Sequence, residues 1–293
     1  MIDFAVIDRL TGARCGMFNT TCPLCSEFRH SAANRRVKIF RIWRIEHRFA
    51  TYHCVHCGAK GYVRDQDSPP PDLANFKKVR AEAAKRNRMH KRERLHKAVW
   101  LWSQRKPICG SIAERYLREK RGIGCQLPAT LGFLPARGEY PPALIAAFGL
   151  AHEVEPGVIA IRGSAIRGVH VTRLQPDGSD RERGEQAKIM IGHSTGSPIV
   201  LGPPNDLLGL GIAEGIENAL SAHEATGLGS WAAGCSTRLP ALADVIPPYI
   251  ECVTLFADDD RDGRRDASTL ADGIAQRGIE VRVTRPGTWR SAA

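Results

Sequence analysis

The chain has 293 residues, of which 43% are hydrophobic and 25% charged, which is the balance of a globular protein with a sizeable buried core. No apolar run reaches the roughly 18 residues that a membrane-spanning helix needs, and the longest candidate is residues 143–151. The first residues also lack the basic segment and apolar core of a secretory signal. We therefore expect a cytoplasmic protein of about two domains, with no membrane partner.

Charge is unevenly distributed along the chain, whose formal net charge is +11. Residues 75–106 carry twelve lysines and arginines against two glutamates, whereas residues 205–285 carry thirteen acidic residues against seven arginines. This pattern suits a protein that grips a polyanion with one part and collects cations with another. We expect the basic segment to contact nucleic acid, and a merely solvated helix is the alternative.

Cysteine usage indicates a metal site rather than a disulfide framework. Two C-x-x-C pairs, Cys22/Cys25 and Cys54/Cys57, are separated by 28 residues, and the nine cysteines of the chain are an odd number. Two such pairs supply four thiolates, which complete a closed, tetrahedral Zn²⁺ site. A redox motif and free core cysteines are the alternatives, but the first lacks a thioredoxin-like context. We predict a structural zinc ribbon over residues 1–67.

Basic and aromatic residues are interleaved in the middle of this ribbon. They are Arg35, Arg36, Lys38, Arg41, Arg44 and Arg48, with Phe40, Trp43 and Phe49 between them. Such a mixture gives an electropositive face with stacking groups for single-stranded DNA. For the aromatic residues a small apolar core is the alternative, and for Trp43 that alternative is favoured.

Residues 68–106 are predicted to form a proline-rich linker and a long basic helix. Three consecutive prolines at 69–71 favour a stiff, extended linker. Either Asp72 or Asn75 is placed to cap a helix after it. Apolar residues then recur at helical intervals at Phe76, Val79, Ala83, Leu95, Val99 and Trp102. The pattern predicts a narrow apolar stripe and a wide basic face.

Residues 107–204 predict an α+β subdomain with an antiparallel sheet. A capping box formed by Ser111 and Glu114 starts a helix that stops at Gly122. Short apolar strands at 157–161 and 168–174 follow, the second closed by a turn at 176–178.

Residues 205–293 change rhythm, because strands now alternate with helices. Strands are predicted at 207–213, 229–233, 252–257 and 279–284, and helices at 216–226, 239–246 and 261–277. Alternation of this kind indicates a parallel sheet with crossover helices.

Acidic residues follow two of these strands. Glu214 ends the first strand, and Asp258 and Asp260 follow the third. The carboxyl ends of parallel strands lie at one edge of the sheet, so the two clusters meet there. Asp258 and Asp260 are two residues apart and point to one side, whereas Asp259 points away. Three converging carboxylates suit Mg²⁺ or Mn²⁺, and a simply solvated acidic loop is the alternative.

These two stretches resemble the Toprim domain of DNA primases, topoisomerases and related nucleases. The first reads Leu-Gly-Ile-Ala-Glu-Gly over 210–215, and the second reads Asp-Asp-Asp-Arg-Asp-Gly over 258–263. The second is especially similar to bacterial and phage-type primases, and the resemblance extends over roughly 107–286. It implies that Glu214, Asp258 and Asp260 hold catalytic Mg²⁺.

The resemblance also implies roles for several basic residues. Arg173 and Lys188 would face template or nucleotide phosphates, with Lys188 in the catalytic set and Arg261 beside the acidic motif contacting the substrate. Glu217 and Asn218 lie one turn into the helix, where they would support a second metal ion or take a solvent-facing capping role. For Arg173 an exposed strand position is an equal alternative.

The resulting fold prediction is an α/β Toprim domain, a small parallel sheet flanked by helices, preceded by an α+β primase-core subdomain and an N-terminal zinc ribbon. The corresponding function is that of a primase-like nucleotidyltransferase, which makes short RNA primers on single-stranded DNA from nucleoside triphosphates. Its context would be a phage, plasmid or other mobile element, with a separate replicative helicase, because the chain has no P-loop.

Two alternatives use the same domain. One is a Toprim nuclease, and the other is a non-catalytic DNA-binding mediator of recombination or replication. A topoisomerase is disfavoured because the chain has no room for a domain with a nucleophilic tyrosine. Asn218 stands where primases carry another acid, and no further aspartate follows the last predicted strand. Whether the site holds one metal ion or two therefore stays open.

Overall fold

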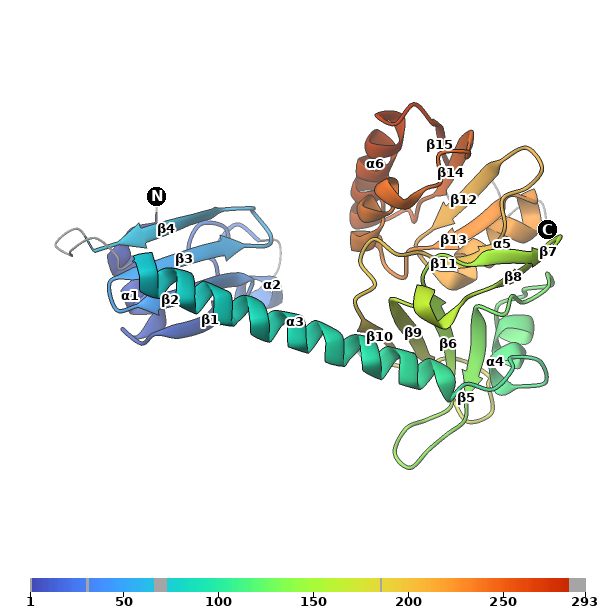
Figure 1. The fold of residues 1–293 in the computed structure, drawn as a ribbon, viewed down its shortest axis with the longest axis horizontal. Coiled ribbons are helices and arrows are strands. Elements are labelled where there is room, and N and C mark those ends of the chain that lie inside the picture. Colours follow the sequence, from blue (N-terminus) through green and yellow to red (C-terminus); the bar gives the residue numbers. More distant parts are fainter. Residues whose placement is uncertain (1, 30–31, 66–72, 185, 285–293) are drawn as a thin grey trace. The chain divides into compact units, whose positions relative to one another are not determined.

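The fold was taken from a computed structural model, which describes residues 2–29, 32–65, 73–184 and 186–284 (Figure 1). The chain divides into two compact units, Met1–Lys85 and Arg86–Ala293. The helix α3 (Leu73–Ser103) contributes to both units and confirms the predicted basic helix. The predicted linker and the candidate cap Asp72 lie outside the described residues. Within the described parts of the chain, no helix is long and apolar enough to cross a membrane.

The first unit is a four-stranded antiparallel meander with a short helix on one face. The strands pair in the order β1-β2-β3-β4. Asp3 caps the first helix by accepting a hydrogen bond of 2.8 Å from the Val6 amide. The elements are α1 (Phe4–Thr11), β1 (Gly16–Thr20), α2 (Ala32–Arg36), β2 (Phe40–Glu46), β3 (Phe49–Cys54) and β4 (Lys60–Arg64).

The second unit begins, after α3, with a helical segment and an antiparallel sheet. The sheet is antiparallel, as predicted for residues 107–204, and has the order β10-β9-β6-β5, whereas the predicted strand at 157–161 lies outside it. In the sequence, a separate two-stranded hairpin and a 3₁₀ turn lie between β6 and β9. The elements are α4 (Ile112–Arg115), the π-helix η1 (Tyr116–Lys120), β5 (Leu131–Leu134), β6 (Ala143–Phe148), β7 (His152–Glu155), β8 (Val158–Ala160), η2 (Gly163–Ala165), β9 (Gly168–Arg173) and β10 (Lys188–Gly192).

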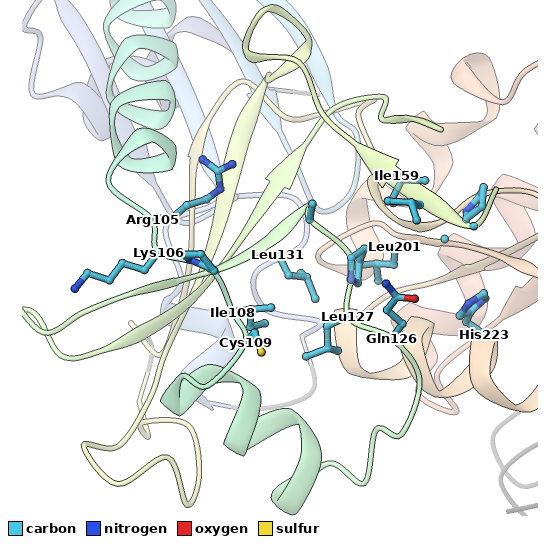
Figure 2. A pocket seen from close by; sticks show the side chains of 17 residues that line it. Arg105, Lys106, Ile108, Cys109, Gln126, Leu127, Leu131, Ile159, Leu201 and His223 are labelled. Carbon is cyan, nitrogen blue, oxygen red and sulfur yellow. The ribbon is translucent and has the colours of Figure 1, made fainter. Parts of the chain in front are cut away.

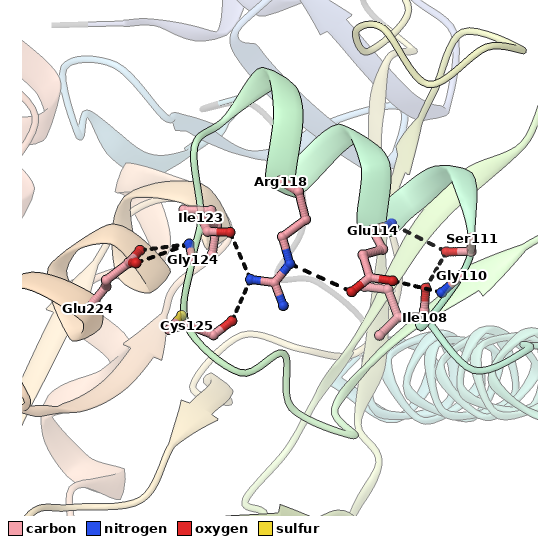
Figure 3. A network of polar contacts seen from close by, with 9 residues as sticks. All are labelled: Ile108, Gly110, Ser111, Glu114, Arg118, Ile123, Gly124, Cys125 and Glu224. Carbon is pink, nitrogen blue, oxygen red and sulfur yellow. Dashed lines mark hydrogen bonds and ion pairs between the residues drawn. The ribbon is translucent and has the colours of Figure 1, made fainter.

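The predicted capping box starts α4. The Ser111 hydroxyl accepts a hydrogen bond of 3.3 Å from the Glu114 amide, and the Glu114 carboxylate accepts one of 2.7 Å from the Gly110 amide (Figure 3). The helical segment ends where predicted, since Gly122 has φ +67°, a conformation that favours glycine. Arg118 then binds the carbonyls of the loop that follows, and this loop is tied to the C-terminal part of the unit by Glu224 (Figure 3).

The C-terminal part is a five-stranded sheet in the order β11-β13-β12-β14-β15. Strands β12 to β15 are parallel to one another, as the alternation of strands and helices predicts. The edge strand β11 is antiparallel to β13. This strand precedes residue 205, so the sheet includes a strand from before the segment in which it was predicted. The elements are β11 (Ile199–Gly202), β12 (Gly209–Ala213), α5 (Ile216–Thr226), β13 (Gly229–Ala232), η3 (Ser236–Arg238), η4 (Pro240–Val245), β14 (Cys252–Phe256), α6 (Arg261–Ala275) and β15 (Glu280–Thr284).

One predicted helix is different in the structure. Where an α-helix is predicted at 239–246, the structure has the 3₁₀ segment η4 (Pro240–Val245). Pro240 has no amide hydrogen to donate, and Pro247 closes the segment from the other side. Fewer than two α-helical turns fit between them, so the tighter i→i+3 hydrogen bonds form, as from the Leu242 amide to the Leu239 carbonyl at 3.0 Å.

Three apolar layers hold the second unit together. Ala98 and Trp102 at the end of α3 pack against one face of the antiparallel sheet. The other face of the antiparallel sheet packs against Tyr116 and Leu117, and these residues pack in turn against α5 and one face of the parallel sheet. The second face of the parallel sheet is covered by η4 and α6. The two sheets therefore share one core through α5, and the carboxyl ends of β12 and β14 lie next to this junction (Figure 1).

Candidate functional site

The four predicted zinc ligands converge in the first unit. The Sγ atoms of Cys22, Cys25, Cys54 and Cys57 all lie within 4.8 Å of one another. Two of the distances, Cys22 to Cys57 and Cys25 to Cys54, are 3.9 Å and 3.8 Å. A tetrahedral ion with Zn–S bonds of about 2.3 Å places its sulfur ligands about 3.8 Å apart, so the cluster fits Zn²⁺ with no open position. All four cysteines are free of disulfides.

The local environment of these thiols favours a bound cation. Burial raises the pKa of Cys25 well above its usual range, and the neighbouring thiols raise it further. At Cys54 burial also raises the pKa, but backbone amides of the knuckle at Cys57 and His56 outweigh it and lower the pKa overall. The knuckle amides therefore stabilise a thiolate at Cys54, while burial keeps Cys22 and Cys25 protonated until a metal ion binds.

The sheet of the first unit has one buried and one exposed face. In β2 the side chains of Phe40, Ile42 and Arg44 are buried, whereas those of Arg41 and Trp43 are exposed. Trp43 therefore lies on the surface, and the prediction that it belongs to the ribbon core is wrong. Phe40 and Arg44 were predicted on a DNA-facing surface, and they point into the core. The strict alternation of side chains along a strand decides this split.

Strand register gathers aromatic and basic side chains on the exposed face. Trp43 pairs with Thr51, which pairs with Tyr62, and Arg41 reaches Lys60 in the same way through His53. The Arg41 guanidinium lies 5.9 Å from the centroid of the Trp43 ring, and Tyr62 stacks on Phe49 at 6.0 Å. We call this surface the ribbon face: Arg41, Trp43, Phe49, Lys60, Tyr62 and Arg64. Lys60, Tyr62 and Arg64 were not singled out from the sequence, although their spacing of two residues is a signal that could have placed them on one face of a strand.

Arg44 has a structural role in the ribbon. It is 3% exposed, and its guanidinium lies 2.6 Å from the Asp8 carboxylate and donates to the Thr11 hydroxyl at 2.7 Å. It also lies 5.2 Å from the centroid of the Phe4 ring. These contacts fasten α1 to β2, so the cation stabilises the unit from within. The other predicted cations Arg35, Arg36, Lys38 and Arg48 are exposed.

In the second unit, the predicted carboxylates lie at one edge of the parallel sheet. Strand β12 pairs with β14 so that Ala213 lies beside Phe256, which places Glu214 and Asp258 at neighbouring strand ends. Burial raises the pKa of Glu214, and the charge of Asp258 raises it further. A backbone hydrogen bond from Ser236 and the charge of Lys188 act in the opposite direction. The strand register thus brings the two acidic clusters to the same edge of the sheet, as expected.

The three aspartates after β14 have different neighbours. The Asp258 carboxylate accepts a hydrogen bond of 2.8 Å from the Asn218 side chain, and Asp260 caps α6 by accepting one of 2.6 Å from the Gly263 amide. Asp259 instead lies 2.7 Å from Arg264, with a side chain that is 63% exposed. Asp258 and Asp260 therefore face the site, and Asp259 turns away from it.

Gly263 is required by the close turn at this motif. A Cβ atom at this position would lie 2.9 Å from the Asp258 carbonyl oxygen, closer than such atoms approach. The absence of a side chain lets the first turn of α6 fold back onto the acidic loop.

The donor set of this edge suits a hard divalent cation. Glu214, Asp258 and Asp260 offer carboxylate oxygens, and their mutual repulsion would be relieved by Mg²⁺ or Mn²⁺. Their oxygens are spread more widely than the four thiols, which form the one tight group of three or more potential metal ligands among the described residues. Asp260 uses one oxygen for its cap, which leaves the other oxygen for a metal ion or its water shell.

Lys188 and Glu217 form an ion pair beside the carboxylates. The Lys188 Nζ atom lies 3.3 Å and 3.4 Å from the two Glu217 oxygens. The Tyr116 hydroxyl donates to Glu217 Oε1 at 2.9 Å. Burial by itself would raise the pKa of Glu217, but Lys188 and the hydrogen bonds lower it to about 2. Glu217 is 15% exposed, so the alternative of a solvent-facing cap is wrong.

Of the other predicted basic residues, Arg173 lies near Lys188 and Arg261 follows the acidic loop. Arg173 ends β9, next to β10, and donates to the Gln186 side chain at 3.3 Å. Arg261 is the first residue of α6 and directly follows Asp260. Lys188 also lines a cavity of about 400 Å³ whose other walls include Arg181 and Arg183.

Two residues near the site carried no recognisable sequence pattern. Tyr116 is fully buried and precedes Glu217 by 101 residues. Arg238 donates to the Ser194 hydroxyl, and its guanidinium lies 5.4 Å from the centroid of the Phe148 ring. The nearby His170 is 2% exposed, and burial together with Lys188 lowers its pKa to about 4. Both missed residues act through partners that are remote in sequence.

A separate cavity of about 560 Å³ lies between the loops around 105–109, 126–131 and 157–159 (Figure 2). Its walls include Gln126, Leu201 and His223. None of the predicted site residues lines this cavity, so it is distinct from the carboxylate edge.

Comparison with known families identifies two parts of the second unit. Residues 209–291 match the model of the Toprim domain, and residues 92–201 match a domain of unknown function, DUF7146. The Toprim match contains β12, β14, Glu214 and the 258–263 motif. No curated protein matches the chain.

Two solved primase structures are similar to the chain. One is the Aquifex aeolicus primase (zinc binding and RNA polymerase domains), with 15% identity and a TM-score of 0.41 over 92% of this chain and 72% of that one. The other is the primase fragment of the bacteriophage T7 primase-helicase protein, with 11% identity and a TM-score of 0.36 over 91% and 89%. TM-scores this low do not establish a shared arrangement. The matched sequence and the observed strand order together identify the C-terminal part of the chain as a Toprim domain, which follows a DUF7146 domain and an N-terminal four-cysteine ribbon.

Proposed function

We propose that the protein is a primase-like nucleotidyltransferase that makes short RNA primers on single-stranded DNA, in the replication of a phage, plasmid or other mobile element. The observation that carries the proposal is the placement of Glu214 and Asp258 at neighbouring strand ends of a Toprim domain, with Asp260 at the start of α6. A four-cysteine ribbon with an exposed aromatic and basic face supports it.

Glu214, Asp258 and Asp260 would hold Mg²⁺ or Mn²⁺. A bound divalent ion supplies charge neutralisation for the attacking and leaving oxygens of a phosphoryl transfer. The protein keeps Asp258 in place through the Asn218 amide and Asp260 through the helix cap. Both groups are thus preorganised before any substrate binds.

The basic residues beside the acidic edge would bind phosphates. Lys188 lines the 400 Å³ cavity together with Arg181 and Arg183, and these three cations outnumber the two acidic residues of its lining, Asp180 and Glu182. A nucleoside triphosphate or a template backbone fits such a surface, since cations neutralise phosphate charge. Arg173 and Arg261 would extend the same contact on either side.

Single-stranded DNA would bind to the ribbon face and to α3. Trp43 and Tyr62 offer ring faces on which bases stack, and Arg41, Lys60 and Arg64 offer charge for the backbone. Along α3, every residue from 84 to 94 is exposed, and this stretch carries six lysines and arginines against Glu93. The six are Lys85, Arg86, Arg88, Lys91, Arg92 and Arg94. Like charges three and four residues apart destabilise an isolated helix, and a polyanion would relieve this repulsion.

The proposal is tested with the purified chain, single-stranded DNA, labelled ribonucleoside triphosphates, and Mg²⁺ or Mn²⁺. We expect labelled oligoribonucleotides from the unchanged protein and a loss of at least about 100-fold in Asp258→Asn, the order of effect seen when a group that stabilises transition-state charge is removed. The asparagine retains an acceptor for Asn218, so the fold is preserved. Asp259→Asn is the matched control, because this neighbouring aspartate pairs with Arg264 outside the site.

Other products would contradict the proposal in distinct ways. Degradation of the DNA that depends on Asp258 would assign the site to a Toprim nuclease. Binding of single-stranded DNA without any new or degraded strand would assign the chain to a non-catalytic mediator. Equal product from Asp258→Asn and Asp259→Asn would remove the carboxylate edge from the chemistry.

A further inference from the structure

The Glu217 carboxylate joins three elements of the second unit. It belongs to α5 of the Toprim domain, and its two partners come from the preceding domain: Lys188 from β10 and Tyr116 from η1. The partners are separated from it by 29 and 101 residues in the sequence. The contact is therefore a tertiary connection between the two domains, and no local helical capping explains it.

The direction of each hydrogen bond in this group is fixed by chemistry. The Arg121 Nε atom donates to the Tyr116 hydroxyl at 2.8 Å, and a guanidinium can only donate. The hydroxyl must then give its own hydrogen to Glu217, which leaves the rest of the carboxylate for Lys188. The Arg121 guanidinium also lies 5.2 Å from the centroid of the Tyr116 ring, which holds the ring and its hydroxyl in this orientation. Arg121 thus donates to Tyr116 and Tyr116 donates to Glu217, whose carboxylate accepts from both the hydroxyl and the Lys188 ammonium.

Lys188 needs such a restraint because its side chain is long and only partly enclosed. It is 31% exposed, whereas Glu217 is 15% exposed. A lysine on a strand end samples many rotamers, and it loses most of this freedom when its ammonium is paired with a fixed carboxylate. The charge of Lys188 acts on Glu214, whose pKa it lowers. Lys188 also lines the cavity to which Arg181 and Arg183 contribute.

We propose that Glu217 and Tyr116 are positioning residues, which hold the Lys188 ammonium at the border between the carboxylate edge and the basic cavity. Glu217 is thereby distinguished from Glu214, Asp258 and Asp260, because its charge is already neutralised by Lys188 and is not offered to a metal ion. What Lys188 does once it is positioned rests on the proposed function. The geometry of the three residues does not depend on it.

The test measures Lys188 directly in the full chain with zinc bound. Lysines are labelled with an amine-reactive reagent, and the labelling rate of the peptide that contains Lys188 is followed by mass spectrometry. In Glu217→Gln we expect this rate to rise roughly tenfold, because an ammonium released from its fixed carboxylate partner regains the rotamer freedom that the ion pair removes. Tyr116→Phe keeps the ring but removes the hydroxyl, and we expect a rise of a few-fold.

Glu224→Gln is the matched control on the same helix. Glu224 also reaches across to the preceding domain, where it accepts hydrogen bonds of 3.0 Å from the Gly124 amide (Figure 3). It is remote from Lys188, so its loss should leave the labelling rate of Lys188 unchanged. A thermal melt of each variant checks that the fold persists.

The outcomes separate the two proposals. If Glu217→Gln and Tyr116→Phe both label Lys188 at the unchanged rate, the positioning role is refuted even when primers are made. If labelling rises in both variants while the unchanged protein makes no primers, positioning stands and the proposed function fails. If both proposals hold, primer synthesis by Glu217→Gln should show a lower kcat, and Glu217→Asp should restore part of it.

Discussion

Acid should weaken the second unit in two steps, because two buried groups resist protonation there. In the folded protein the pKa of His170 is lowered from 6.5 to about 4, first by burial and then by the charge of Lys188. The pKa of Glu217 is lowered from 4.5 to about 2, since Lys188 and Tyr116 outweigh the effect of burial. At a pH between the ordinary pKa and the lowered pKa of each group, the unfolded chain therefore binds a proton that the folded chain does not bind.

The sign and size of the effect follow from proton linkage. Each depressed pKa contributes stability above the unfolded value, and this stability is lost as pH falls toward the folded value. His170 therefore acts between about pH 6.5 and 4, and Glu217 between about pH 4.5 and 2. At about 1.4 kcal/mol for each pKa unit, the loss is on the order of 3 kcal/mol for each group.

Hydrogen exchange of peptides from α5 provides the assay. These peptides belong to the second unit, so they report its stability even if the ribbon loses its metal ion in acid. The opening free energy is measured at about pH 7, 5.5, 4 and 2.5, with intrinsic exchange rates taken into account, so that the series covers both windows. We expect it to fall with pH in the unchanged protein. In His170→Gln the slope between pH 6.5 and 4 should be largely absent, whatever the stability at pH 7.

His193→Gln is the control, since this histidine is exposed and the slope should persist without it. Glu217→Gln should keep the upper step and lose the one below about pH 4.5. An opening free energy that stays constant from pH 7 to 4 in the unchanged protein would refute the reasoning. So would a His170→Gln variant with the full slope.

Three further predictions concern other parts of the chain. Cys57→Ser should abolish binding of one Zn²⁺ and unfold the ribbon, measured by metal content and circular dichroism, whereas the exposed Cys15→Ser should retain both. Trp43→Ala should weaken single-stranded DNA binding by about 1–3 kcal/mol, a loss of affinity of roughly 5- to 150-fold measured by fluorescence anisotropy. Val55→Ala changes an exposed apolar residue outside the ribbon face and should leave the affinity intact. Equal losses in both variants would exclude stacking on Trp43. Gly263→Ala should cost about 1–3 kcal/mol in urea unfolding, since its Cβ would lie 2.9 Å from the Asp258 carbonyl oxygen, and an unchanged midpoint would contradict this close contact.

Much of the local structure was predictable from the sequence. The spacing of Cys22, Cys25, Cys54 and Cys57 is sufficient to predict a closed zinc site, because each pair forms its own knuckle. The Ser111 cap, the Gly122 stop and the alternation over 207–284 are equally local, since each depends on residues a few positions apart. The alternation also places Glu214 and Asp258 at one edge, because parallel strands end on the same side.

Features that depend on the partner of a side chain needed the tertiary structure. The sequence shows that basic and aromatic residues are interleaved around β2, but only the position of α1 decides that Phe40 and Arg44 are buried and Trp43 is exposed. The prolines around η4 shorten a segment whose apolar pattern resembles an α-helix.

Glu217 shows the same limit at the site. Three residues after Glu214 on an acidic helix, it has the sequence context of a metal ligand or a solvated cap. Its actual role depends on Lys188 and Tyr116, which reach it only when the antiparallel sheet and the Toprim sheet share one core. Periodicity and spacing are properties of neighbouring residues, so the sequence by itself determined the elements and the edge where the acids lie. Charge pairing is a property of distances in space, and for that reason the tertiary structure alone decided which carboxylates remain available to a metal ion.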